Sequence, residues 1–256
     1  MSTPEAPWLD ALVIGAGFGG LGAALSLAER GARVALHEAL AYPGGCASTF
    51  RRGGFRFESG ATLFSGLAAD SLFGAWIARH RLDLTIDWLD PLVELRTPSL
   101  SLSVGRDRAA FIEALAALPG APPRLRDFFA MQRRVADLLW GLFDDPDLLP
   151  PLDARALLRH AARLPRYAPL LALVGRPLST VLDRFGLAGF APLRAYLDGL
   201  CQITVQCSSA EAEAPFALAT MDYYWRGTGH VRGGIGELAT ALTGALVSMT
   251  MVPPGS

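Results

Sequence analysis

The chain contains 256 residues with a formal net charge of −1, and 51% of its residues are hydrophobic while 18% are charged. This length provides for one large or two modest domains with ample material for a core. The charge gives no reason to expect nucleic acid as a partner, because no basic domain or basic and aromatic patch stands out. The mean hydropathy of +0.31 is high for a chain without a convincing membrane span. Some apolar surface is therefore expected to meet lipid or an apolar ligand.

The cysteines and histidines indicate neither a disulfide framework nor a metal centre. Cys46, Cys201 and Cys207 form an odd set without C-x-x-C or metal-ligand spacing. This pattern predicts free thiols in a reducing, cytoplasmic setting and no metal site. Serine, histidine and aspartate show no arrangement typical of acyl transfer, so the sequence does not identify catalytic residues.

The stretch from Ala11 to Ala28 is uncharged over 18 residues, the lower edge of the length that a transmembrane helix needs. Glu5 and Asp10 precede it and no Lys or Arg does, whereas a first span or a signal peptide usually has a positive flank. Five glycines between positions 15 and 22 would also weaken a continuous helix by roughly 1 kcal/mol each. The stretch is therefore interpreted as a strand, a turn and a helix.

The segment "GAGFGG" places Gly15, Gly17 and Gly20 at the three glycine positions of G-x-G-x-x-G, with Phe18 and Gly19 between them. In a dinucleotide fold the first glycine permits the tight turn, the second allows backbone to approach a pyrophosphate, and the third allows close helix–strand packing. The start of the following helix then stabilises the phosphates. The alternative is a glycine-rich face for helix packing.

The flanking residues favour the dinucleotide interpretation. They predict a strand over 10–14, a helix over 21–30 that ends at a C-cap glycine, Gly31, and a second strand over 33–38. That strand ends in Glu38, 18 residues after Gly20 and near the place where an acidic residue binds a ribose hydroxyl.

A second glycine turn follows at Pro43, Gly44 and Gly45, and residues 55–64, "FRFESGATLF", alternate as a strand does. The order of dinucleotide turn, Glu, "GG" turn and "E-x-G" segment resembles the flavin-dependent amine oxidase superfamily. The segment "PGGCASTFRRGGFRFESGATLFSGL" looks most like its phytoene desaturase and carotenoid isomerase branch.

The resemblance implies FAD as the cofactor. The acidic residue would bind the adenosine ribose, the "GG" turn would lie near the pyrophosphate and ribityl chain, and the glycine after the acid would lie near the isoalloxazine. Carried over to this sequence, the expected cofactor contacts are Gly15, Gly17, Phe18, Gly19, Gly20, Glu38, Gly44, Gly45, Cys46, Gly60, Ala61 and Thr62.

Cys46 stands where amine oxidases commonly have Arg, which speaks against an amine oxidase and suits the carotenoid branch. The cysteine itself is expected to fill space beside the glycine turn rather than to carry chemistry. Arg51 and Arg52 could contact phosphate, although solvated charge in a hairpin loop is favoured.

The predicted fold class is α/β, with an incomplete Rossmann-like FAD-binding domain and an inserted, largely helical substrate domain. The FAD-binding domain takes residues 1–66 and 221–256, and the inserted region, which faces substrate and membrane in the resembled family, takes 67–220. A strand pair is expected within 88–104. The expected helices are 108–118, 123–144, 153–163, 178–185, 191–205 and a last helix from about 235.

Residues 153–185 place six arginines among leucines, with Asp153 and Asp183 opposing them. This basic amphipathic pattern is typical of a surface that lies on anionic lipid. A solvated helical face is the alternative, and the family resemblance favours a peripheral membrane contact. In the later segment "MDYYWRGTGHVRGG", Asp222 and His230 could lie near substrate, but a capping or loop role is favoured for each.

The leading function is therefore a FAD-dependent oxidoreductase of the carotenoid desaturase and isomerase type, acting on an apolar polyene. The net reaction, whether desaturation, isomerisation or saturation, is left open. A non-catalytic remnant and a flavin amine oxidase-like enzyme on a small substrate are the alternatives. Because the resemblance covers only the front half of the family pattern, it also implies a fragment of a longer enzyme or a partner chain that supplies the C-terminal half.

Overall fold

The computed structural model of the protein describes residues 8–61 and 64–250, and it divides into two compact units. The first unit comprises Met1–Leu89 and Gly227–Ser256, and the second comprises Asp90–Arg226. These boundaries lie later than the positions 66/67 and 220/221 expected from the sequence. The difference arises because a helix and a short strand between residues 72 and 87 pack within the first unit.

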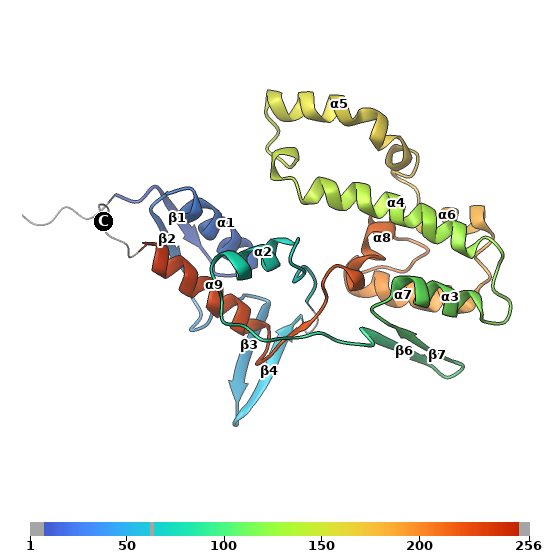
Figure 1. The fold of residues 1–256 in the computed structure, drawn as a ribbon, viewed down its shortest axis with the longest axis horizontal. Coiled ribbons are helices and arrows are strands. Elements are labelled where there is room, and N and C mark those ends of the chain that lie inside the picture. The colour runs from blue at the N-terminus through green and yellow to red at the C-terminus, as the bar shows by residue number, and fades with distance from the viewer. Residues whose placement is uncertain (1–7, 62–63, 251–256) are drawn as a thin grey trace, which may run out of the picture. The chain divides into compact units, whose positions relative to one another are not determined.

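The first unit opens with the expected strand, helix and strand (Figure 1). Strand β1 (Ala11–Ile14) pairs in parallel with β2 (Val34–His37), and helix α1 (Phe18–Glu29) connects them. Gly31 has a φ of +86° directly after the C-cap residue of α1, which confirms its predicted position at the end of the helix. The helix begins three residues earlier than expected, because the backbone already turns helical after Gly17.

The remainder of the first unit is joined to this part chiefly through its last helix, which packs on α1. Strands β3 (Ala47–Arg52) and β4 (Phe55–Gly60) form an antiparallel hairpin, followed by helix α2 (Leu72–Arg79) and strand β5 (Ile86–Asp87). After the second unit, β8 (His230–Val231) pairs antiparallel with β5, and helix α9 (Ile235–Thr250) packs against α1 and β3. The core of the unit includes Leu25, Trp76, Val231, Leu238 and Leu242.

The second unit is mostly helical, as predicted. It begins with the hairpin of β6 (Val93–Thr97) and β7 (Leu100–Val104), which confirms the expected strand pair. The helices that follow are α3 (Arg108–Ala116), α4 (Leu125–Phe143), the short η1 (Pro146–Leu148), α5 (Ala154–Leu171), α6 (Leu178–Phe185), α7 (Ala191–Thr204), α8 (Ala214–Thr220) and the short η2 (Tyr223–Trp225).

Helix α4 organises the second unit, because it packs against α3, α5, α6 and α8. Its buried face carries Leu125, Phe128, Phe129 and Val135. The ring of Phe129 meets Phe111 of α3 edge-on, and the ring of Phe128 meets Phe185 of α6 in the same way. These edge-to-face contacts restrict the geometry in which the helices can cross, in addition to the stabilisation that comes from burying the rings.

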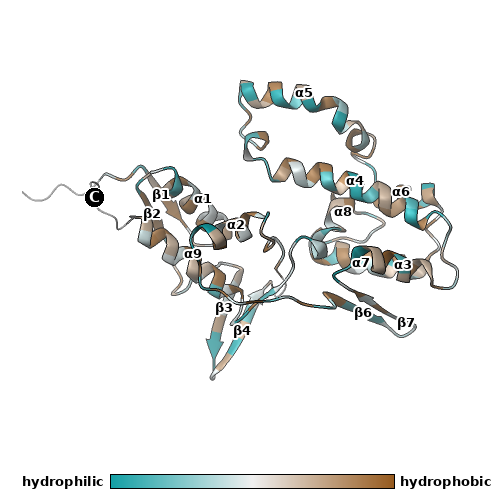
Figure 2. Cartoon of the chain, viewed as in Figure 1, coloured by the Kyte–Doolittle hydropathy of each residue, from teal (hydrophilic) through white to brown (hydrophobic). Residues whose placement is uncertain are grey.

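Helix α5 is longer than the sequence predicted, since it continues to Leu171 instead of ending near 163. It contains Pro165 and Pro169, and a proline inside a helix removes a backbone donor. The two prolines are four residues apart and both are exposed, so they fall on one solvent-facing side of the helix. Apolar and polar residues are mixed along α5 (Figure 2). None of the described helices combines the length and hydropathy that a bilayer crossing requires.

Candidate cofactor-binding site

The first glycine turn joins β1 to α1, and two of its glycines are required by its geometry. Gly15 has a φ of +98°, a conformation that other residues rarely adopt. A Cβ on Gly20 would overlap the carbonyl oxygen of Gly15 and would lie 3.5 Å from Cγ1 of Val13. Gly20 therefore lets the first turn of α1 lie directly against the end of β1, the packing that the glycine spacing predicted.

The second glycine turn lies against the first. The Gly44 N–H donates to the Ala16 carbonyl at 2.8 Å, and Gly17 and Gly44 form a parallel bridge. A Cβ on Gly45 would lie 3.2 Å from the Cα of Gly17. The two turns thus form one backbone-walled surface at the start of α1, here called the glycine cradle: residues 15–20 and 44–45.

The first turn of α1 contains no side chain that competes for an anion. Its N-cap residue is Gly17, which has no side chain to cap the helix, and no acidic residue stands in the first turn. The first amides and the partial positive charge of a helix N-terminus are therefore available to a bound anion. A phosphate is the ligand that such a helix start stabilises in dinucleotide-binding proteins.

Glu38 follows β2 at the edge of the glycine cradle. Its Oε2 accepts a hydrogen bond from the Ala16 N–H at 2.6 Å, and its Oε1 accepts one from the Leu40 N–H at 2.9 Å. The hydrogen bonds from Leu40 and then Ala16 hold the pKa of this carboxyl below its ordinary value. The group is thus an ionised, oriented acceptor, and each oxygen keeps a further lone pair for a hydroxyl donor.

Phe18 contributes to this region differently from the glycines. Its ring packs on Phe64 and Phe73, with centroid distances of 5.2 and 5.5 Å, and Phe73 in turn meets Trp76. The side chain of Phe18 therefore belongs to the core of the first unit, and only its backbone faces the turn.

The third expected contact segment lies at the end of β4. Gly60 has a φ of +89°, and a Cβ there would lie 2.8 Å from the carbonyl oxygen of Cys46. The end of β4 is thereby held next to the second glycine turn, and Ala61 follows it. Thr62 lies outside the described residues. The side chain of Cys46 is exposed, so it does not fill interior space as the sequence suggested.

Sequence reasoning did not identify the roles of Ser48, Thr49 and Glu58. Glu58 Oε1 accepts the Ile235 N–H and Thr49 Oγ1 accepts the Gly236 N–H, both at 2.9 Å, so the β3–β4 hairpin caps the start of α9. The hydroxyl of Ser48 is buried beside Gly44 and has no hydrogen-bond partner among the described residues. The "E-x-G" segment could have pointed to Glu58, whereas nothing in the sequence distinguishes Ser48.

Asp222 stands at the N-cap position of η2, as expected, although its side chain makes no cap hydrogen bond there, and His230 lies in a strand instead of a loop. His230 lies in β8 opposite Asp87 of β5. Asp222 is buried, and its Oδ1 lies 3.0 Å from Nη1 of Arg108 and accepts a hydrogen bond from Gln132 at 3.1 Å. Burial raises the pKa of Asp222, while the Gln132 bond and the Arg108 charge act in the opposite direction. Asp222 therefore forms a buried ion pair inside the second unit.

Residues 13–77 match the family of NAD(P)-binding Rossmann-like domains. An oxidoreductase from Methanosarcina mazei superposes with a TM-score of 0.57 at 17% identity, covering 94% of this chain and 49% of that one. A fatty acid isomerase from P. acnes superposes with a TM-score of 0.52 at 16% identity, covering 93% and 50%. The fold is thus an α/β fold with a Rossmann-like dinucleotide-binding region, as predicted.

Three curated relatives indicate which branch of the superfamily the chain resembles. The chain is 29% identical to prolycopene isomerase 2 of an Oncidium hybrid cultivar, over 95% of its own length and 42% of the relative. It is 28% identical to human all-trans-retinol 13,14-reductase, over 90% and 38%. It is 32% identical to hydroxyneurosporene desaturase of Rhodobacter capsulatus, over 67% and 40%. These relatives confirm the resemblance to the carotenoid desaturase and isomerase branch, and the chain spans about two fifths of their length.

The packing of Gly20 gives a first testable prediction. Gly20→Ala should lower the free energy of unfolding of the first unit by about 1–3 kcal/mol or more, because the new methyl group overlaps backbone that has little room to move. Gly19→Ala is the matched control, since a Cβ at Gly19 meets no atom within 4 Å. The control should be neutral or stabilising by up to about 1 kcal/mol, as for any glycine replaced in a helix. Chemical denaturation measures both, and equal effects would contradict the packing role.

The buried ion pair gives a second prediction. Asp222→Ala should lower the free energy of unfolding of the second unit by about 3–5 kcal/mol, because it leaves the Arg108 guanidinium buried without its partner. Asp137→Ala removes an exposed ion pair with Arg133 in the same unit and should cost about 0–1 kcal/mol. Thermal and denaturant unfolding of both variants would show the difference, and a mild effect of Asp222→Ala would argue against the pair.

Proposed function

We propose that this chain supplies the cofactor cradle and the substrate-facing region of a FAD-dependent oxidoreductase of the carotenoid desaturase and isomerase type. The substrate class is an apolar polyene. The observation that carries the proposal is the glycine cradle with the oriented Glu38 carboxylate at its edge. The names of the relatives, a prolycopene isomerase, a retinol reductase and a carotenoid desaturase, support the polyene class.

The residues present fit the proposed cofactor. A Cβ on Gly44 would lie 2.7 Å from the Ala47 carbonyl oxygen, and one on Gly45 would lie 3.2 Å from the Cα of Gly17, so the second turn is built for glycine. The start of α1 lacks a capping side chain, and the buried Ser48 hydroxyl beside Gly44 has no hydrogen-bond partner among the residues that the structure describes. A backbone-walled cradle with an unclaimed helix start is the arrangement that a pyrophosphate requires.

Each part of the cradle would have its own task toward FAD. Glu38 would accept hydrogen bonds from the adenosine ribose, and the amides at the start of α1, from Gly17 to Gly20, would bind the pyrophosphate. Gly44 and Gly45, with Cys46, would border the pyrophosphate and ribityl chain, and Gly60 with Ala61 and Thr62 would border the ring system. When bound, the flavin supplies hydride transfer, and the protein contributes binding, orientation and exclusion of water.

The Glu38 carboxylate gives a direct test of the cofactor. Glu38→Ala should weaken FAD binding by about 1–3 kcal/mol, because the ribose hydroxyls lose their acceptor. Quenching of flavin fluorescence on titration into the chain, or into a longer protein that contains it, measures the affinity. Asp70→Ala, at an exposed acid of the same unit, is the control and should leave the affinity unchanged. Preference for a nicotinamide dinucleotide over FAD would sink the proposal.

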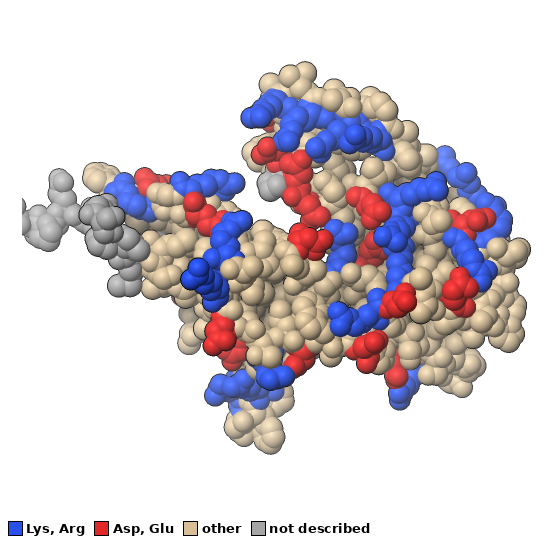
Figure 3. Space-filling model, viewed as in Figure 1, with Lys and Arg blue, Asp and Glu red and all other residues tan. Residues whose placement is uncertain are grey.

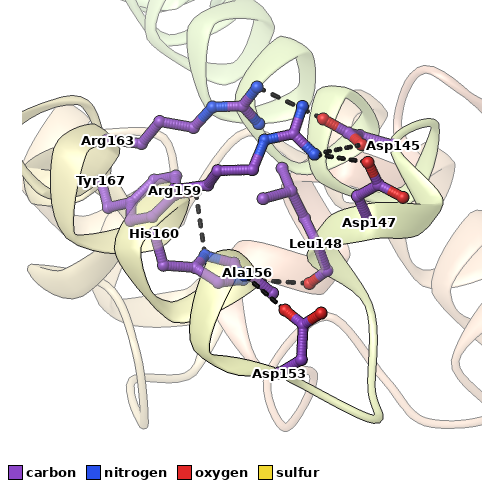
Figure 4. A network of polar contacts seen from close by, with 9 residues as sticks. All are labelled: Asp145, Asp147, Leu148, Asp153, Ala156, Arg159, His160, Arg163 and Tyr167. Atoms are coloured by element: carbon purple, nitrogen blue, oxygen red, sulfur yellow. Dashed lines mark hydrogen bonds and ion pairs between the residues drawn. The ribbon is translucent and has the colours of Figure 1, made fainter.

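A peripheral membrane contact through α5 belongs to the same proposal. The inner side of α5 is polar: Arg159 lies 2.7 Å from Asp147, Arg163 lies 3.3 Å from Asp145, and His160 contacts the Leu148 carbonyl at 3.0 Å (Figure 4). Leucines of the same helix are exposed instead, and Leu158 is 72% exposed. Outward leucines beside exposed arginines are typical of a helix that lies on a lipid surface.

The ion pairs of α5 determine which of its arginines can be replaced to test the proposed membrane contact. Arg159 and Arg163 hold α5 to the segment around η1, so replacing them would disturb the fold. Arg155, Arg166, Arg176 and, in α6, Arg184 are exposed, and Figure 3 shows basic residues together with uncharged surface along α5. These arginines form no ion pair with a described residue and are open to anionic lipid.

Vesicle flotation should separate the two interpretations of α5. Leu157→Ser with Leu158→Ser, or Arg155→Glu with Arg166→Glu, should lower retention on anionic vesicles, by about fivefold for each arginine replaced. Ala161→Ser with Ala162→Ser, at exposed positions of the same helix, should have little effect. If both test variants are retained as well as the parent protein, α5 is only a solvated face.

A further inference from the structure

The β3–β4 hairpin carries an aromatic surface that no described residue covers. Phe50 pairs with Phe57 across the strands and Arg52 pairs with Phe55, so these four side chains lie on one face of the hairpin. The rings of Phe50 and Phe57 stack with 5.6 Å between centroids, and Phe55 is 71% exposed. Phe50, Phe55 and Phe57 are called the aromatic face below.

The opposite face of the hairpin packs on α9, which fixes the direction of the aromatic face. Thr49 and Glu58, which are paired across the strands, accept the first amides of α9. Arg56 on that same side donates to the Gly233 carbonyl at 3.2 Å and lies 3.5 Å from Glu237. The aromatic face therefore points away from α9, and the tip of the hairpin projects beyond the helices of its unit (Figure 1).

The tip of the hairpin is also positively charged. Arg51 and Arg52 are exposed, and within the described ranges neither forms an ion pair or a side-chain hydrogen bond. Arg51 stands opposite Arg56, whose charge is met by Glu237. Glu58, the acid of the hairpin, is engaged by α9. Arg51 and Arg52 therefore carry positive charge that no described acid neutralises, and a bound anion near the tip would do so.

We propose that this tip inserts into an anionic lipid surface, with the aromatic face in the interfacial region and Arg51 and Arg52 at the phosphate groups. Exposed aromatic side chains beside arginines match the two layers of such a surface, an apolar boundary and a charged headgroup layer. The tip, at Phe55, is the end of the hairpin opposite Gly60, the proposed cofactor contact, and it lies in a different unit from α5.

The size and charge of the tip favour lipid over a protein partner. A stable protein interface buries about 800 Å² on each partner. Three phenylalanines that bury at most about 150–250 Å² each, part of it already lost to the Phe50–Phe57 stack, do not reach that area. Arginines on both strands also discourage edge-to-edge pairing with a second copy of the chain.

The test places a reporter at the tip. Phe55→Trp protein is mixed with phosphatidylcholine and phosphatidylserine vesicles whose acyl chains carry bromine, which quenches nearby indole fluorescence. We expect quenching beyond that of the parent protein, and less of it when phosphatidylserine is omitted. Adding Leu157→Ser and Leu158→Ser to the Phe55→Trp variant tests whether α5 contributes to the quenching. The fraction of this protein that binds vesicles should show the same quenching of the indole at the hairpin tip. Absence of extra quenching in bound Phe55→Trp protein would overturn the proposal.

Flotation provides the second arm of the test. Arg51→Glu with Arg52→Glu should lower the partition coefficient about thirtyfold, since each arginine near an anionic surface contributes roughly a factor of five. Phe55→Ser with Phe57→Ser should lower it about tenfold or more. Leu72→Ser removes an exposed leucine of α2 in the same unit and is the matched control, which should change nothing. If the phenylalanine variant floats like the control, or if it instead abolishes self-association in sedimentation, lipid is not the partner.

Discussion

The close approach of two glycine turns is the constraint on which the first unit depends. Gly20 places α1 against the end of β1, and Gly17 meets Gly44 and Gly45 backbone to backbone. No side chain fits between these segments, so van der Waals contact of backbone atoms sets the distance between the first helix and the second turn. Because glycines stand at these positions, backbone amides rather than methyl groups face any ligand at the start of α1. Packing and anion binding thus follow from one cause.

Glu38 and the β3–β4 hairpin connect the glycine turns to the rest of the first unit. The Glu38 carboxylate bonds the Ala16 amide, so the acid at the end of β2 is fixed relative to the first glycine turn. The hairpin that follows the second turn supplies Thr49 and Glu58 to the start of α9. Since α9 packs in turn on α1, the helix that closes the described chain and the first glycine turn are held to each other through the hairpin. A segment from residue 235 onward therefore completes a unit begun at residue 11.

The second unit shows a reversal of the usual arrangement on a helix. In α5, arginines and a histidine face the protein, where they meet Asp145, Asp147 and the Leu148 carbonyl, while leucines face outward. Exposed leucines cost free energy in water, and ion pairs on the inner face recover only part of it. The proposed lipid contact would cover the exposed leucines of α5.

Elements whose conformation depends on neighbours along the chain could be predicted without the structure. The glycine spacing, Gly31 and the alternation before Glu38 predicted the β1–α1–β2 unit, because φ angles, caps and periodicity are local properties. The bounds of α6 and the strand pair of β6 and β7 were predicted for the same reason. The resemblance to the carotenoid branch also came from short motifs and agrees with the relatives found along the chain.

Which side of each element faces the protein, in contrast, depends on how distant segments pack together. An arginine-rich helix has the same sequence whether its arginines meet lipid or aspartates, and the position of Asp145 and Asp147 under α5 settles the roles of Arg159 and Arg163. From the sequence, Asp222 is interpreted as a loop or capping residue. In the fold, Arg108, more than a hundred positions away in the sequence, forms an ion pair with its carboxylate. Likewise, the role of Ser48 depends on its position beside Gly44, and the role of Glu58 depends on its hydrogen bond to the start of α9. Contacts between residues distant in sequence decide these roles, and no local pattern records them.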